Sequence, residues 1–143
     1  MNRFLAAVLA AAFLAGGALP ASAQAESAAQ VEQQIGQQEY QQLRQKGEII
    51  TNSPYYAILN PIAQRISRVA NPQYDFPFHF ILVHESQPNA FAVPGGNVYV
   101  TDTMMTFVQN KEELAGVLCH ETSHDIHHDV LNLYQKRQHA ADQ

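Results

Sequence analysis

The stretch EELAGVLCHETSH, residues 112–124, decides the fold and the chemistry expected of this chain. Apolar residues recur in it at three- and four-residue steps, which predicts an amphipathic helix. Asn110 precedes the run and Glu113 follows three residues later, an arrangement typical of a helix N-terminus with a capping box. The sequence therefore predicts a helix that begins after Asn110 and carries an HExxH pentad at residues 120–124.

The pentad indicates a metal site. His120 and His124 are four residues apart and so share one face of a helix, where both imidazoles can bind one Zn²⁺. Glu121 lies beside them as a base that can take a proton from an activated water. The alternative is an ordinary polar helix face. The apolar residues 114–119 favour the metal, because a polar side chain inside a core needs a partner.

The N-terminus has the pattern of a secretory signal peptide, residues 1–23. Arg3 supplies the positive charge, residues 4–14 form an apolar run too short to span a bilayer, and Ala21-Ser22-Ala23 is a cleavage site. An uncleaved membrane anchor is the alternative. We expect one peptidase domain over residues 24–143, located in the periplasm or secreted.

The amino-acid composition limits the classes of molecule that the chain is expected to bind. The chain has 13 acidic and 8 basic residues and a formal net charge of −5, with no basic block. It is therefore a poor candidate for binding nucleic acid or anionic lipid, whereas peripheral association with the envelope membrane and the oligomeric state stay open. Cys119 is the only cysteine, which excludes an internal disulfide, and it is interpreted as a small buried residue.

Other segments alternate between helix and strand. Residues 24–46 predict a helix ending near Gly47, although their glutamine bias fits a mobile polar arm equally well. A second helix is expected to begin at Asn52-Ser53-Pro54 and to bury Ile58, Ile62, Ile66 and Val69. Strands are predicted over residues 78–83 and 97–101, and a short helix over residues 103–109.

The run from residue 117 to residue 143 has neither Gly nor Pro, so one continuous helix is expected after the pentad. On a straight helix, Asp125 points off the ligand face and Asp129 is too far along to complete a metal site. His124 and His128 could form a second, weaker metal site, with a solvated polar face as the favoured alternative. His79 and His84 are interpreted as structural.

Two blocks, NAFAVPGGNVYV at residues 89–100 and ELAGVLCHE at residues 113–121, resemble the gluzincin peptidases related to HtpX, BepA and the CAAX prenyl protease. The resemblance covers roughly residues 30–133. It implies an α+β, zincin-like fold with N-terminal helices, a small sheet and a buried HExxH helix.

The resemblance also implies roles for individual residues. His120 and His124 would bind one Zn²⁺, and Glu121 would be the general base. Residues 97–101 would be the edge strand on which an extended substrate lies, since an edge strand offers backbone N–H and C=O groups to a peptide of any sequence. The implied substrate-binding residues are Gly95, Gly96, Asn97, Val98 and Tyr99.

The chain departs from the family at the third zinc ligand, which the family takes from a Glu on a separate, later helix. No such helix follows His124 in the sequence, so we expect the N-terminal portion of a longer catalytic domain. The predicted function is a zinc metalloendopeptidase acting on envelope or misfolded polypeptides. The alternative is a catalytically inactive, chaperone-like module that binds polypeptide without cutting it.

Overall fold

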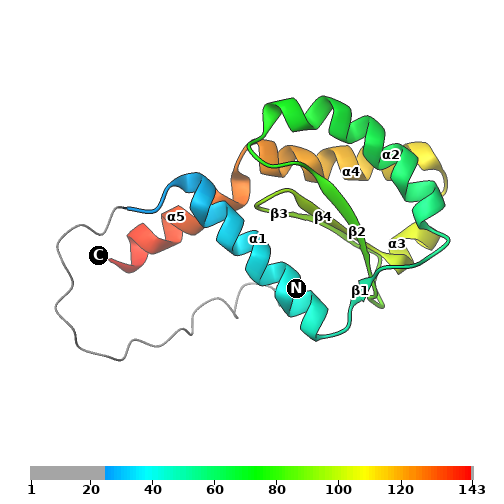
Figure 1. The fold of residues 1–143 in the computed structure, drawn as a ribbon, viewed down its shortest axis with the longest axis horizontal. Helices are drawn as coiled ribbons and strands as arrows, with labels where there is room; N and C mark the ends of the chain where they lie inside the picture. Colours follow the sequence, from blue (N-terminus) through cyan, green and yellow to red (C-terminus); the bar gives the residue numbers. More distant parts are fainter. Residues whose placement is uncertain (1–24, 143) are drawn as a thin grey trace.

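The computed structural model describes residues 25–142, so the predicted signal peptide lies outside the described residues (Figure 1). The fold is α+β, as the resemblance implied. A 3₁₀ turn at Asn71–Gln73 follows the second helix. The remaining elements in chain order are α1 Ala28–Gln45, β1 Ile49–Ile50, α2 Tyr56–Ala70, β2 His79–Val83, β3 Ala90–Val93, β4 Asn97–Thr101, α3 Asp102–Phe107, α4 Lys111–Ile126 and α5 Asp129–Ala141.

The four strands form one mixed sheet in the order β1-β2-β4-β3. β2 and β4 are parallel, whereas β1 pairs with β2 and β3 pairs with β4 in the antiparallel sense. The strand at residues 97–101 is confirmed, but the prediction that it is an edge strand is wrong. β4 is central because β3, a strand that the coarse sequence pattern missed, covers its outer side.

Successive residues of β4 point into two different cores. Val98 and Val100 pack with residues of α2 and α4, whereas Tyr99 packs with Leu43 of α1. Figure 1 accordingly shows α2 and α4 on one face of the sheet and α1 on the other. Alternation of side chains along a strand thus distributes apolar residues to both helical layers.

α1 is a helix rather than a mobile arm. Ser27 Oγ accepts a hydrogen bond from the Gln30 N–H, and Gln30 Oε1 accepts one from the Ser27 N–H, which completes a capping box. Further along, Gly36 meets the β3–β4 turn so closely that a Cβ at this position would lie 2.4 Å from Pro94 O. This contact joins the N-terminal helix to the turn between β3 and β4.

The second helix differs from its prediction in its start and in its buried face. α2 begins at Tyr56, two residues after Pro54, because Ser53 Oγ accepts a hydrogen bond from the Tyr55 N–H in a preceding turn. Ile62 is buried as predicted, but Ile58 is 38% exposed and Val69 is 67% exposed. The core face is instead completed by Leu59, Ala63 and Ala70.

The expected continuous helix after the pentad is wrong. α4 ends at Ile126 and α5 begins at Asp129, with His128 between them in the left-handed region at φ 55°. His128 Nδ1 lies 2.7 Å from Oε1 of Glu32, a buried residue of α1. Histidine adopts this backbone region more readily than most residues, and a contact from a distant helix holds it there. Sequence rules that look for Gly or Pro do not detect such a turn.

Gly96→Ala should lower the free energy of unfolding by about 3 kcal/mol. A non-glycine residue at positive φ is strained, and the position that its Cβ would take is already occupied by the backbone of Pro77. Gly96 has φ 100°, and a Cβ there would lie 2.3 Å from Pro77 O. Urea denaturation measures the change. Gly116→Ala is the matched control, since a Cβ on Gly116 meets nothing within 4 Å. Equal losses in the two variants would contradict the prediction.

Candidate metal centre

α4 is anchored so that one of its faces stays open. Asn110 Oδ1 accepts a hydrogen bond from the Glu113 N–H at 2.8 Å, which confirms the predicted N-cap. Glu113 in turn accepts a hydrogen bond from the Gln109 N–H at 3.0 Å, one residue before the N-cap. Leu114 and Leu118 are buried in the core with α2 and the sheet. The pentad histidines consequently project from the accessible side of the helix.

The two pentad histidines converge. His120 Nε2 and His124 Nε2 are 3.1 Å apart. Ligand atoms of His120, His124 and Glu121 all lie within 4.8 Å of one another. Within residues 25–142, this is the one such group of three or more His, Cys, Asp and Glu side chains. Two imidazole nitrogens directed at the same point are a donor set that fits Zn²⁺.

Asp129 supports one of these histidines. Its Oδ2 lies 2.7 Å from His124 Nδ1. When Nδ1–H donates to the carboxylate, the lone pair of Nε2 is left for a metal, an arrangement found behind many metal-binding histidines. The turn at His128 brings Asp129 back toward His124, whereas a straight helix would have carried it away. Asp129 therefore positions His124, a role that the sequence pattern did not reveal.

Asp129→Asn should weaken zinc binding by about 10- to 100-fold, the usual effect of losing a carboxylate behind a metal-binding histidine. Isothermal titration with Zn²⁺ on the metal-free protein measures the affinity. Asp142→Asn is the matched control, because it removes the same charge from the C-cap of the same helix α5. Unchanged affinity in Asp129→Asn would show that the carboxylate does not support His124.

Asp125 is buried directly behind the histidine face, so the prediction that it points away from the ligands is confirmed. It is 2% exposed, and neither of its carboxylate oxygens makes a well-formed hydrogen bond, although the nearby Gly96 N–H partly offsets the rise in its pKa. Burial raises the pKa of Asp125 to about 8, and the negative charges of Glu32 and Glu121 add to this shift. The Asp125 carboxyl is therefore largely protonated at neutral pH, which limits the negative charge beneath the site.

The remaining histidines and the cysteine lie apart from the pentad. His128 does not join the pentad group, and its side chain is 41% exposed, so it belongs to a partly solvated face on which Nδ1 pairs with Glu32. His84 Nδ1 pairs with Asp102, in agreement with a structural role. Cys119 is exposed, which corrects its interpretation as a buried residue. It lines a pocket between α2 and α4, beside Ala115 and Ile126.

The five predicted substrate-binding residues lie in three settings. Asn97, the first residue of β4, donates a hydrogen bond from Nδ2 to the Tyr99 hydroxyl at 3.2 Å. Gly95 and Gly96 form the turn before β4, and both have positive φ. Val98 and Tyr99 are fully buried in a strand that is paired on both sides, so a peptide has no access to them. The edge strand beside α4 is β3.

Comparison with known proteins agrees with this geometry. The sequence profile of peptidase family M48 matches residues 56–140, from the first residue of α2 into α5. The chain belongs to peptidase family M48. The match includes β2, β3, β4 and the whole of α4 with its HExxH pentad.

Three M48 relatives illustrate the similarity. The beta-barrel assembly-enhancing protease of Escherichia coli (strain K12) is 31% identical over 110 residues, 77% of this chain and 22% of the relative. The mitochondrial metalloendopeptidase OMA1 of Schizosaccharomyces pombe is 30% identical over 73 residues, 51% of this chain and 21% of the relative. The protease HtpX homolog of Thermoanaerobacter pseudethanolicus is 34% identical over 89 residues, 59% of this chain and 28% of the relative. The chain thus spans 21–28% of the length of these relatives.

Proposed function

We propose that this M48 chain is a zinc-dependent metalloendopeptidase domain that hydrolyses peptide bonds in envelope or misfolded proteins. The observation that carries the proposal is the convergence of His120 Nε2 and His124 Nε2, 3.1 Å apart. These two histidines would hold the ion. Bound Zn²⁺ would polarise the scissile carbonyl and lower the pKa of a water molecule.

The protein's own side chains would then move protons and hold the site in shape. Glu121 lies next to the ligand face and would take the proton from the attacking water and deliver it to the leaving amine. Asp129 would keep His124 in the tautomer that leaves Nε2 free. Asp125, whose pKa burial raises to about 8, lies on the buried side of the helix and would take no part in the proton transfer.

Substrate would bind along β3 in place of the predicted β4. β3 is at the edge of the sheet and packs against α4, so an extended polypeptide added there would run past the pentad. Gly95 and Gly96 shape the turn at the end of this strand. Such recognition depends mainly on backbone groups and so suits substrates of varied sequence.

We place this activity in the bacterial envelope, in the periplasm or outside the cell. The signal-peptide pattern of residues 1–23 supports this location, as does the similarity to a beta-barrel assembly-enhancing protease. None of the helices within residues 25–142 is long and apolar enough to cross a membrane. Residues 24–143 would form the peptidase domain, with polypeptides as its substrates.

A non-catalytic polypeptide-binding module is the second candidate. Within the described residues, the pentad group contains two histidines and Glu121 but no third ligand from another element. Zinc held by two histidines and water would bind weakly and would not be set up for catalysis. The presence of Glu121 as a base favours the peptidase.

Metal dependence separates the two candidates. For the peptidase, we expect one Zn²⁺ per chain in isothermal titration and cleavage of casein that stops when 1,10-phenanthroline removes the metal and returns with added Zn²⁺. His120→Ala should abolish both binding and cleavage, whereas His139→Ala, on the exposed part of α5, should change neither. Casein binding without any cleavage in saturating zinc would favour the second candidate.

A further inference from the structure

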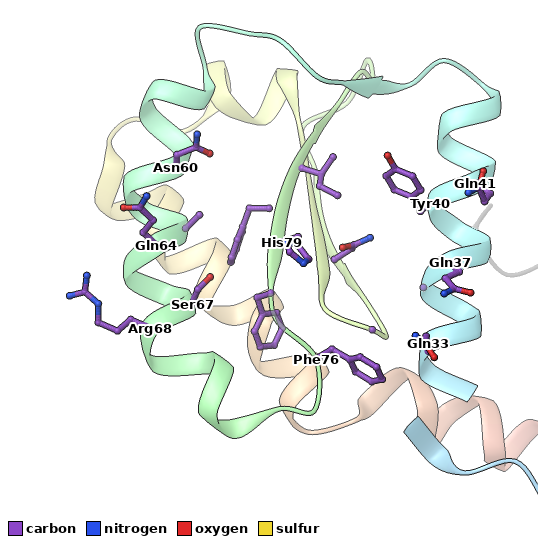
Figure 2. Close-up of a pocket in the computed structure, with 17 residues that line it drawn as sticks. Gln33, Gln37, Tyr40, Gln41, Asn60, Gln64, Ser67, Arg68, Phe76 and His79 are labelled. Carbon is purple, nitrogen blue, oxygen red and sulfur yellow. The ribbon is translucent and has the colours of Figure 1, made fainter. Parts of the chain in front are cut away.

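A groove of about 970 Å³ lies on the side of the molecule formed by α1, α2 and β2. Figure 2 shows side chains of α1 and α2 on the two sides of β2, with His79 beside the strand. β3 and α4, which carry the proposed peptidase chemistry, contribute no residue to its lining. Gly95 and Asn97, two of the residues first implied in substrate binding, do line it, but none of the pentad residues does. The groove is therefore separate from the metal centre.

One edge of β2 opens into this groove. β1 pairs only with Leu82 and Val83, so residues 79–81 have a strand partner on the β4 side alone. The His79 N–H donates to Gly96 O on that side, and the His84 N–H donates to Glu48 O on the other. Because the direction of the N–H groups alternates along a strand, the Phe80 N–H and C=O point away from β4.

The positions on either side of Phe80 along this edge already have partners. The Phe78 N–H donates to Asn71 Oδ1 at 3.0 Å, and the Leu82 N–H donates to the Tyr56 hydroxyl at 3.0 Å. Phe80 therefore offers one backbone donor and acceptor pair between two capped positions. An added strand would bond to Phe80 in the interval between the Asn71 and Tyr56 side chains, so its ends would have to turn away from β2 at these two positions.

The walls suit a peptide backbone. Amide side chains, each able to donate and accept hydrogen bonds, line both helices, whereas the strand side combines apolar residues with the polar His79 and Asn97. The amides are Gln33, Gln37 and Gln41 of α1 and Asn60 and Gln64 of α2. Phe76 and Ile81 supply apolar surface between them. A peptide in this position could bond through its main chain and bury alternate side chains.

The charged residues that line the groove indicate the charge of the segment it would bind. No Asp or Glu lines the groove, although the chain has 13 acidic residues and a formal net charge of −5. Its ionisable lining residues are Tyr40, Arg68 and His79. Arg68 would attract an acidic segment, and the rest of the acidic chain would repel acidic segments elsewhere.

We propose that this groove binds an extended, acidic polypeptide segment of a partner protein as an added strand on β2. It would hold a polypeptide at a place distinct from the metal centre. The binding requires neither zinc nor cleavage, so it stands or falls separately from the proposed peptidase activity.

The test uses the full chain in chelator and a fluorescein-labelled heptapeptide of alternating threonine and valine with a central aspartate. Amide hydrogen exchange followed by NMR should show rapid exchange at Phe80 in the free protein, slowed at least tenfold by saturating peptide. Exchange at Ile81, whose N–H faces β4, should change little. No slowing at Phe80 would overturn the proposal.

Variants test the groove walls by fluorescence polarisation. Gln37→Trp and Gln64→Trp should each weaken peptide binding at least tenfold, whereas Gln38→Trp, an exposed neighbour outside the lining, should not. Arg68→Glu should weaken binding more than Arg65→Glu, on the same helix but outside the groove. Equal effects within either pair would contradict the assignment. If the Phe80 amide is protected from exchange in the free protein and this protection disappears on dilution, the occupant of the groove is a second copy of the chain. That result would overturn the proposal of a partner protein.

Discussion

Glu121→Gln is expected to remove nearly all peptide-bond cleavage while zinc binding persists. Loss of a general base costs about 10²- to 10⁴-fold in turnover. The substitution is nearly isosteric and leaves both imidazoles in place, so the affinity for Zn²⁺ should change little. Casein cleavage in saturating Zn²⁺ measures turnover, and isothermal titration measures binding.

Glu112→Gln is the control for this experiment. Glu112 is exposed in the first turn of the same helix and lies outside the pentad group. It should retain wild-type turnover. A Glu121→Gln variant that cuts casein at the wild-type rate would eliminate Glu121 as the base, and with it the mechanism proposed for this chain. Loss of zinc binding in the same variant would instead make Glu121 a structural member of the site.

The parts of the metal centre that could be predicted are those determined by neighbours in sequence. Asn110 begins α4, and the four-residue spacing of His120 and His124 brings their Nε2 atoms together. Both depend on the geometry of one helix, which sequence spacing describes directly. The strand Asn97–Thr101 was likewise predictable, because alternation of Val98, Tyr99 and Val100 between the two cores is a local pattern.

The parts that could not be predicted depend on contacts between distant segments. The turn at His128 is held by Glu32, 96 residues earlier in the chain, and that turn is what brings Asp129 to His124. Strand order is similarly non-local. Residues 90–93 form a short apolar segment whose pairing with β4 nothing in their own composition indicates. The error about the substrate edge therefore followed from the missing strand β3.

The buried carboxyl of Asp125 makes stability depend on pH in an unusual direction. Its pKa is raised to about 8 in the folded protein, mainly by burial, from the usual 3.8 of an aspartate carboxyl. Between these values the folded state binds more protons than the unfolded state, so the free energy of unfolding falls as pH rises. The contribution of Asp125 is complete below about pH 4 and is lost as pH rises through about 8.

Asp125→Asn should remove this dependence. Near pH 9, the variant should exceed the wild type in free energy of unfolding by an amount on the order of 5 kcal/mol, since each pKa unit corresponds to about 1.4 kcal/mol. At pH 4, where the wild-type carboxyl is already neutral, only the pH-independent cost of burying the amide should separate the two proteins. Urea denaturation from pH 4 to pH 9 in chelator measures the difference, with the exposed Asp75→Asn as control.

The test is whether the difference in free energy of unfolding between Asp125→Asn and the wild type changes with pH. Its size at any single pH decides nothing. An amide in place of Asp125 would make no well-formed hydrogen bond, because neither carboxylate oxygen makes one, and that cost is the same at every pH. The Glu32–His128 pair is common to both proteins, so comparing the variant with the wild type isolates the change at residue 125. A constant difference between Asp125→Asn and wild type from pH 4 to pH 9 would mean that Asp125 is ionised in the folded protein throughout. The acid beneath the histidines would then need a cation or buried water molecules to stabilise its charge.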